Sequence, residues 1–324
     1  MSSTTLVNIF LFVSSIGIVW YFAGVLIESV THLARRFKKT GFTAAFFLLG
    51  FLTSISEFSV ATNATLKGVP EVSVGNLIGG SFVVLLFIVP LLAVLAGKIE
   101  LRNTLSRRNL LLALTTVALP ALLVIDGNVT RVDGLVSILV YITLVYSIYR
   151  QKQDIPDTAA VKRPFDIKRP LITDIGRILL GGVMIFFASK VLVDQAVFFA
   201  LLFGAPTSLV GLLLLSLGTN IPEFTVAIRS VIKNHSDVAF GDYIGSSAVN
   251  TFIFGMLPFA SGAFLFNTGE TTSTTILLVI GLVVFFLFAR SDSKLTRREG
   301  GVLLVFYLAF IALQIGELVK YATQ

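Results

Sequence analysis

The chain has no cysteine, only two histidines and one tryptophan, and few charged residues for a length of 324. Without cysteine it has no disulfide framework, and two histidines give no His-rich metal or catalytic cluster. Charged residues make up 13% of the chain, against about 25% in an average soluble domain, whereas 55% of the residues are hydrophobic. A soluble fold of this length could not hide so much apolar surface. The composition excludes a soluble enzyme and predicts a protein embedded in a lipid bilayer.

Ten apolar runs follow one another along the chain, each near the roughly 20 residues that a helix needs to cross a membrane. Helices are expected because lipid offers no hydrogen-bond partner to unpaired backbone groups. We therefore expect an all-α polytopic membrane protein with ten transmembrane helices. The runs span residues 6–30, 43–66, 72–96, 109–125, 132–149, 174–194, 207–232, 238–264, 273–289 and 300–319.

The basic residues are divided unevenly between the two sets of loops that ten helices create. Of the 25 Lys and Arg residues, all but Lys67, Arg131, Lys190 and Lys320 fall on one side. By the positive-inside rule that side is cytoplasmic, which predicts an integral protein of the plasma (inner) membrane with both termini outside. The net charge of +7 then reflects topology and requires no nucleic-acid partner.

A sequence repeat relates two halves of the chain. When 53–83 is aligned without gaps to 219–249, 13 of the 31 positions are identical, and the identities include the acids Glu57 and Glu223. Biased apolar composition does not align acidic residues in this way. The repeat divides the chain into a first five-helix half (1–150, motif 50–84), a charged cytoplasmic linker (151–172) and a second five-helix half (173–324, motif 216–250).

Because each half has an odd number of helices, the second copy enters the membrane from the opposite side to the first. The predicted fold is therefore two inverted five-helix repeats. This arrangement is typical of secondary transporters, whose substrate site lies near the midplane where the copies meet.

Glu57 and Glu223 each lie in the middle of a predicted span, among apolar residues. A carboxylate at that depth costs several kcal/mol unless it is protonated, paired or bound to a metal ion. Neither repeat has a basic residue nearby, so two converging carboxylates favour a cation. Hard oxygen ligands suit Ca²⁺, which takes 6–8 of them, so other oxygens must complete the site.

The helix ahead of Glu223 is expected to be opened, and the helix ahead of Glu57 to be bent less strongly. Pro222 removes a donor and clashes with the Gly218 carbonyl, which opens the helix. Ser56 occupies the matching place in the first half, where its hydroxyl can bond the Leu52 carbonyl and bend the helix. Irregular backbone at membrane depth is tolerated where it lines an ion site.

Polar side chains near each glutamate are further candidate oxygen donors. Thr53 and Thr219 precede the glutamates by one helical turn. In the third and eighth spans, small residues allow close helix packing, but Asn76 and Asp242 are more polar than packing demands. Asp242 is a candidate third anionic group or proton site, and Asn250 is another candidate donor.

Together these segments resemble a known family. Thr-Ser-Ile-Ser-Glu at 53–57 and Gly-Thr-Asn-Ile-Pro-Glu at 218–223 are each followed by a Gly-Asn/Asp-x-x-Gly-Gly/Ser-Ser segment. They resemble the α-1 and α-2 repeats of the Ca²⁺/cation antiporter superfamily, most closely its sodium/calcium exchanger branch, whose usual patterns are G-T-S-x-P-E and G-N-x-x-G-S-N.

The resemblance implies that the paired glutamates and the threonine carbonyls bind Ca²⁺ and that Ser54 and Ser246 help to bind Na⁺. The chain departs from the pattern where Asn220 replaces a serine, and where Gly80 and Val84 replace polar residues in the first half. These departures leave Na⁺ and H⁺ open as the counter-ion. The candidate cation ligands are Glu57, Glu223, Thr53, Thr219, Ser54, Asn220, Ser246, Asn250, Asn76 and Asp242.

The resulting hypothesis is a secondary antiporter that exchanges Ca²⁺ for Na⁺ or H⁺ by alternating access. Alternatives are a cation channel built on the same repeat, an antiporter for another divalent cation such as Mn²⁺, and a membrane scaffold that transports nothing. An enzyme is not expected, because Ser54, Ser56 and Ser81 have no histidine at membrane depth to activate them. The transported ions are substrates, and no cofactor is expected.

Overall fold

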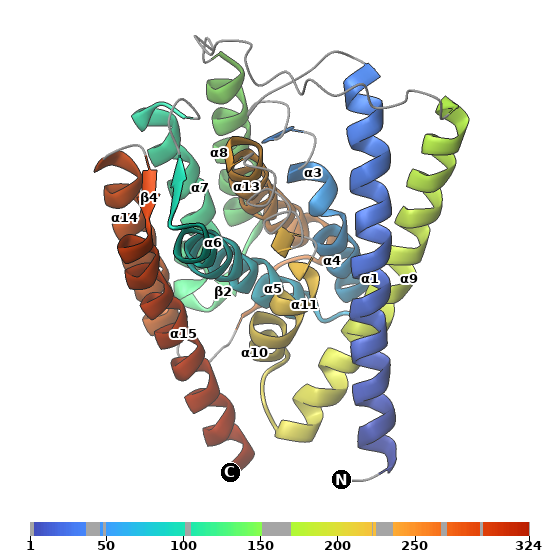
Figure 1. The fold of residues 1–324 in the computed structure, drawn as a ribbon. Coiled ribbons are helices and arrows are strands. Elements are labelled where there is room, and N and C mark those ends of the chain that lie inside the picture. The colour runs from blue at the N-terminus through green and yellow to red at the C-terminus, as the bar shows by residue number, and fades with distance from the viewer. Residues whose placement is uncertain are drawn as a thin grey trace.

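Helices make up nearly all of the structure (Figure 1), a computed structural model that describes residues 3–36, 46–47, 50–100, 105–150, 170–221, 223–224, 236–266, 271–291 and 294–323. The first half contains α1 (Ser3–Arg36), α3 (Gly50–Thr53), α4 (Ile55–Leu66), α5 (Pro70–Phe82), the π-helical segment η2 (Val83–Ile88), α6 (Val89–Ala96), α7 (Arg107–Leu123), η3 (Val124–Asp126) and α8 (Arg131–Arg150). The second half contains α9 (Leu171–Phe203), α10 (Thr207–Val210), the π-helical segment η5 (Gly211–Leu215), α11 (Ser216–Thr219), α13 (Ser236–Ser261), α14 (Thr271–Ser291) and α15 (Arg297–Thr323).

Within the described residues, eight helical segments are long and apolar enough to cross a membrane. They match eight of the ten predicted runs. The other two runs, 43–66 and 207–232, are divided: the first includes α3 and α4, and the second includes α10, η5 and α11. Parts of these two runs, and the predicted linker up to residue 169, lie outside the described residues. The chain is thus a helical membrane-spanning protein in which two predicted spans are interrupted.

The elements of the first half recur in the second at the spacing of the sequence repeat. α3 begins at Gly50 and α11 at Ser216, while α8 begins at Arg131 and α15 at Arg297. Both pairs of starting residues are equivalent when the alignment of the two motifs is extended along the chain. Two short antiparallel pairings join the halves: β1 (Lys98–Glu100) pairs with β4 (Lys294–Thr296), and β2 (Asn128–Val129) pairs with β3 (Phe264–Leu265). The repeat relates β1 to β3 and β2 to β4, so the two pairings, each between one strand from either half, are equivalent to each other.

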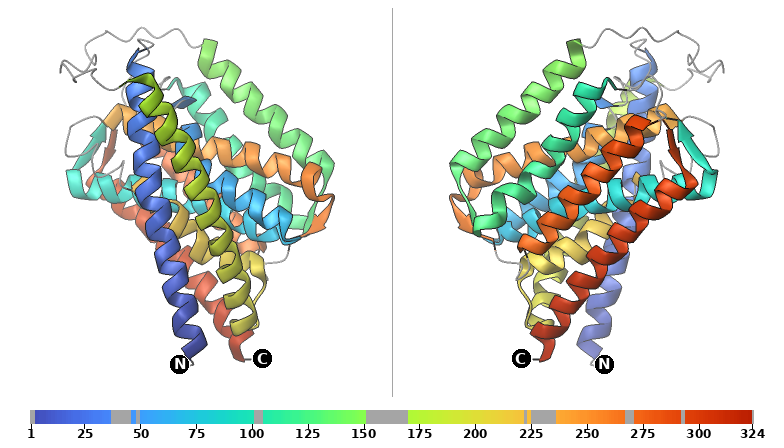
Figure 2. Two further views of the ribbon diagram at one scale, coloured as in Figure 1. Left: turned by 90° about the vertical axis from the view of Figure 1, so that its right-hand side faces the viewer. Right: turned by 90° about the vertical axis from the view of Figure 1, so that its left-hand side faces the viewer.

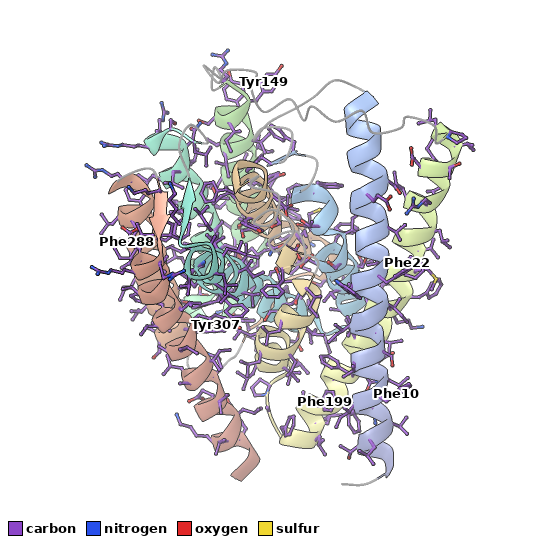
Figure 3. The ribbon with its side chains drawn as sticks, viewed as in Figure 1. Phe10, Phe22, Tyr149, Phe199, Phe288 and Tyr307 are labelled. Carbon is purple, nitrogen blue, oxygen red and sulfur yellow. The ribbon has the colours of Figure 1, made fainter. Side chains whose placement is uncertain are left out.

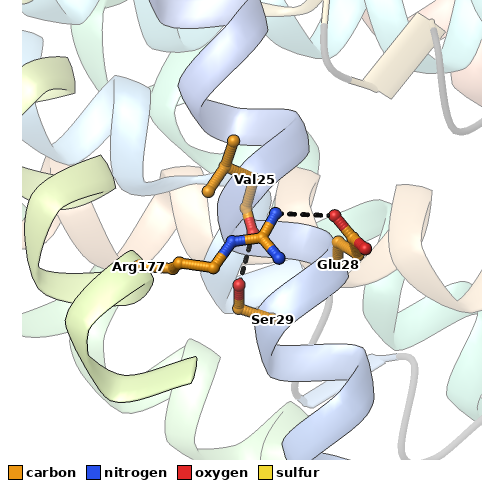
Figure 4. A network of polar contacts seen from close by, with 4 residues as sticks. All are labelled: Val25, Glu28, Ser29 and Arg177. Carbon is orange, nitrogen blue, oxygen red and sulfur yellow. Dashed lines mark hydrogen bonds and ion pairs between the residues drawn. The ribbon is translucent and has the colours of Figure 1, made fainter. Parts of the chain in front are cut away.

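The two longest helices, α1 and α9, lie side by side along one flank of the bundle and run in opposite directions (Figure 2). Both chain termini lie at the same end of the molecule. Arg177 of α9 forms an ion pair with Glu28 of α1, with Nη2 2.7 Å from Oε2 (Figure 4). This ion pair joins the two helices near the end opposite the termini.

Apolar side chains cover the outside of the bundle as well as its core. Phe10 on α1 is 69% exposed and Tyr149 on α8 is 74% exposed, near opposite ends of the molecule (Figure 3). Inside, the Phe82 and Phe310 rings stack with centroids 3.9 Å apart. An apolar exterior over an apolar core is expected where lipid replaces water as the solvent.

Helices of opposite halves cross closely at glycines. A Cβ atom on Gly50 of α3 would lie 2.6 Å from the carbonyl carbon of Gly245 in α13. At the equivalent crossing, a Cβ on Gly79 of α5 would lie 2.7 Å from the Cβ of Ser216 in α11. These crossings bring the ends of α3 and α11 against the long helices of the opposite half.

The Gly50 crossing predicts a local stability effect. Gly50→Ala should lower the apparent Tm of the detergent-purified protein, because overpacking against backbone costs about 1–3 kcal/mol. The matched control is Gly182→Ala on α9, where a Cβ would meet nothing within 4 Å. In the control, the better helix propensity of alanine should leave Tm unchanged or raised. Equal Tm changes in the two variants would contradict the tight crossing.

Candidate cation-binding site

The helices that carry the paired glutamates both break at equivalent residues. α3 ends at Thr53 and α4 begins at Ile55, while α11 ends at Thr219. The residues at the breaks, Ser54 and Asn220, have ψ angles of 4° and 9°, far from the α-helical value near −42°. Each break lies shortly before a glutamate, and the residue that ends the preceding helix is a threonine.

The predicted cause of the second break, Pro222, lies outside the described residues. In the first half Ser56 takes the place of the proline, and the helix is interrupted there as well, between α3 and α4. The Ser56 hydroxyl lies 3.0 Å from the Thr53 carbonyl, not on Leu52 as the sequence suggested, and 2.8 Å from Glu57 Oε2. It also lies 3.4 Å from the Thr219 carbonyl. Ser56 thus connects both threonine carbonyls with a glutamate, a role that the sequence analysis missed.

Three carboxylates are buried in this region. Glu57, Glu223 and Asp242 are each at most 1% exposed. Both oxygens of Glu223, Oε1 of Glu57 and Oδ2 of Asp242 have no hydrogen-bond partner among the described residues. The Glu223 carboxylate interacts electrostatically with those of both Glu57 and Asp242. Like charges therefore gather here without a described basic partner, which is stable only with a proton or a cation.

Hydrogen bonds cross between the halves in a symmetric pattern. The Thr53 hydroxyl of the first half donates to Asp242 Oδ1 of the second at 3.3 Å. The Thr219 hydroxyl of the second half donates to Asn76 Oδ1 of the first at 3.1 Å. The sequence repeat relates Thr53 to Thr219 and Asn76 to Asp242. Both threonine hydroxyls are thereby fixed by the opposite half, beside carbonyls that end α3 and α11.

A second set of polar contacts flanks the carboxylates. The Ser54 hydroxyl donates to the Gly50 carbonyl at 2.8 Å and lies 3.4 Å from the Ser246 carbonyl. In the other half, Asn220 Nδ2 donates to the Ser216 carbonyl at 2.7 Å. Asn250 lies nearby, with Nδ2 3.3 Å from the position that a Cβ on Gly80 would take.

All ten predicted site residues are buried, and the contacts above connect eight of them across the two halves. The other two, Asn220 and Asn250, reach the first half where their side-chain nitrogens lie beside Gly80. Within the described part of the chain, no group of three or more His, Cys, Asp or Glu side chains has the arrangement of a metal site. The available donors are therefore mixed: a few carboxylate oxygens together with carbonyl and hydroxyl oxygens. Oxygen-only sets of this kind suit a hard cation.

Comparison with known proteins gives a consistent result. The family model described as "Sodium/calcium exchanger protein" matches residues 7–150 and 174–316. An uncharacterized membrane protein of Methanocaldococcus jannaschii is 26% identical over 282 residues, covering 87% of this chain and 89% of that protein.

Two further proteins carry functional names. The sodium/calcium exchanger MaX1 of Methanosarcina acetivorans is 31% identical over 142 residues, covering 43% of this chain and 39% of that protein. A structure of the sodium-calcium exchanger NCX_Mj soaked with 10 mM Na⁺ and 10 mM Sr²⁺ matches with a TM-score of 0.66 and 22% identity, covering 95% of this chain and 98% of that chain. The structural match establishes a common fold.

The unpartnered carboxylates predict a stability gain on substitution. In chelator-treated, cation-free buffer, Glu223→Gln should raise the apparent Tm, because the amide can donate to the carbonyls around it and removes a buried charge. The free energy of unfolding should increase by an amount on the order of 1–3 kcal/mol. The matched control is Glu317→Gln on α15, since Glu317 is buried but paired with Lys320. The control should not be stabilised, and a Glu223→Gln protein that melts lower than the parent would contradict this reading of the site.

Proposed function

This chain belongs to the sodium/calcium exchanger protein family, and from that membership we propose that it exchanges Ca²⁺ for Na⁺ or H⁺ across the membrane by alternating access. In this proposal Glu57 and Glu223, one from each half, hold the divalent ion near the midplane. The ions are substrates of transport, and the chain catalyses no covalent reaction.

One observation carries the proposal: two buried glutamates, one from each half of the chain, have carboxylate oxygens without hydrogen-bond partners among the described residues. A divalent cation between them would neutralise both charges. The Thr53 and Thr219 carbonyls are further ligands in this proposal, because both lie within reach of the Ser56 hydroxyl that contacts Glu57. Ca²⁺ accepts such a mixed set because it takes 6–8 oxygens in flexible geometry.

An inverted repeat of two five-helix halves is part of the same proposal. Its support is the recurrence of element bounds at the spacing of the sequence repeat, the opposite directions of α1 and α9 in Figure 1, and the exchanged strand pairs. The two broken segments, around Ser54 and Asn220, would then be the remaining two of ten spans. Alternating access requires the halves to move against each other around a fixed site.

Movement in this proposal involves α1 and α9 relative to the helices that hold the site. The glutamates lie outside both helices, and α1 and α9 contact each other extensively. Driving ions would compete with Ca²⁺ for the same oxygens, so that the site exchanges its occupants without holding both. Each elementary charge moved through 100 mV is worth about 2.3 kcal/mol, so any electrogenic exchange would respond to voltage.

The proposed transport predicts the effect of removing one carboxylate. Glu57→Gln should abolish ion-gradient-driven ⁴⁵Ca²⁺ accumulation in proteoliposomes, reducing it to the level of protein-free vesicles, because the amide removes one of the two charges that hold the ion. Glu317→Gln on α15 is the matched control and should transport like the parent. Separate outward Na⁺ and H⁺ gradients identify the counter-ion. Accumulation against a Ca²⁺ gradient excludes a channel, and undiminished uptake by Glu57→Gln would reject the site.

The proposed orientation in the plasma membrane is tested by thiol labelling followed by purification of the protein, because the chain has no cysteine of its own to react. Thr323→Cys, at the end of α15, should react with a membrane-impermeant maleimide in intact cells. Arg150→Cys, at the end of α8, should react only after the membrane is permeabilised. The reverse pattern would place the termini inside and contradict the orientation derived from the basic residues.

A further inference from the structure

The two halves differ at two positions beside the glutamates, and these positions contact each other. In the alignment of the two motifs, Ser54 corresponds to Asn220, and Gly80 corresponds to Ser246. In the first contact, the Ser54 hydroxyl lies 3.4 Å from the Ser246 carbonyl. In the equivalent contact, Asn220 Nδ2 lies 3.0 Å from the position that a Cβ on Gly80 would take. The side chain of Asn220, which is larger than that of Ser54, therefore lies in the space left by the missing side chain of Gly80.

Among the described residues, the hydrogen-bond partners of the Ser54 hydroxyl are oxygen atoms. We call this set, formed by the Gly50 carbonyl, the Ser54 hydroxyl and the Ser246 carbonyl, the oxygen cluster. The hydroxyl donates to Gly50 O at 2.8 Å and keeps lone pairs available. The Ser246 hydroxyl lies 3.4 Å from the Tyr243 carbonyl, with no nitrogen involved. A small cation can be bound by such a set of oxygens without breaking a strong hydrogen bond.

In the second half, amide N–H groups lie beside Asn220 at the position equivalent to the oxygen cluster. The atom 2.7 Å from the Ser216 carbonyl must be the amide nitrogen, because a carbonyl oxygen only accepts. This carbonyl corresponds to that of Gly50, and both accept a hydrogen bond, from an amide here and from the Ser54 hydroxyl in the first half. The same nitrogen lies 3.5 Å from the Thr219 hydroxyl oxygen. The two atoms nearest to a Cβ on Gly80 are the amide nitrogens of Asn220 and Asn250, at 3.0 and 3.3 Å, whereas Asn220 Oδ1 lies farther away, at 3.7 Å. Amide hydrogens carry partial positive charge and do not coordinate a cation.

We propose that Asn220, seated against Gly80, fills the counterpart of the oxygen cluster and prevents a monovalent cation from binding there. Monovalent cations then bind beside the glutamates only on the Ser54 side, and the two halves contribute unequally to counter-ion binding. The inference rests on the proposed function, because it concerns ions that compete with Ca²⁺ at the same site. It makes the Asn220–Gly80 pair the determinant of how many monovalent cations bind.

The test exchanges the two arrangements in the full-length, detergent-purified chain. Asn220→Ser with Gly80→Ser rebuilds the oxygen cluster in the second half. The mirror variant, Ser54→Asn with Ser246→Gly, converts the first half to the second-half arrangement. The readout is the dependence of Tm on the logarithm of NaCl concentration, with choline chloride keeping ionic strength constant. Its slope reports how many Na⁺ ions bind the folded state, since ligand binding to the folded state stabilises it.

The Asn220→Ser/Gly80→Ser variant should have a slope larger than the parent's by one Na⁺ site, and the mirror variant a slope smaller by one site. Gly80→Ser alone should lower Tm, because its Cβ would lie only 3.0 Å from Asn220 Nδ2, and adding Asn220→Ser should restore the Tm. Equal Na⁺ slopes in the parent and the rebuilt variant would overturn the inference, as would a Gly80→Ser Tm that Asn220→Ser does not restore.

A parallel ⁴⁵Ca²⁺ binding measurement on the same samples separates the two proposals. Failure of the parent to bind Ca²⁺ would reject the proposed function. The Na⁺ slopes do not depend on that result and still decide the inference about Asn220 and Gly80.

Discussion

The burial of Glu57 and Glu223 without hydrogen-bond partners for most of their oxygens is the constraint on which the rest of the structure depends. Two like charges in an apolar interior oppose folding unless something neutralises them. The surrounding groups do not do so, because they are carbonyls, hydroxyls and a third carboxylate, Asp242. The buried carboxylates therefore lower the stability of the protein without a bound ion. A bound cation would offset this loss of stability.

The repeated architecture explains how such a region is held in place. The helices that lead to the glutamates break at equivalent residues, so that α3 ends at Thr53 and α11 ends at Thr219, each shortly before a glutamate. Glycine crossings press these broken ends against the long helices of the opposite half, and each threonine hydroxyl bonds to that half. In the proposed site the oxygens come from both halves, so both halves would be needed to hold an ion.

Much of this arrangement was predictable from sequence, because hydropathy, charge and the repeat act over long stretches. Eight predicted spans correspond to long apolar helices, and the two predicted threonines bond to Asp242 and Asn76 of the opposite half. The break at Ser54 was underestimated because serine lacks the steric signal of proline. The contacts of Ser56, and the packing of Asn220 against Gly80, depend on which side chains of opposite halves meet. Residue spacing along one chain does not contain that information.

The most direct test of Ca²⁺ binding between Glu57 and Glu223 is an experimental structure of this protein at saturating Ca²⁺ concentration. We expect one Ca²⁺ ion with oxygens of both Glu57 and Glu223 within about 2.3–2.6 Å, the usual range for Ca²⁺–oxygen contacts. A Ca²⁺ ion bound to only one of these residues, or bound elsewhere while the two carboxylates stay apart, would contradict it.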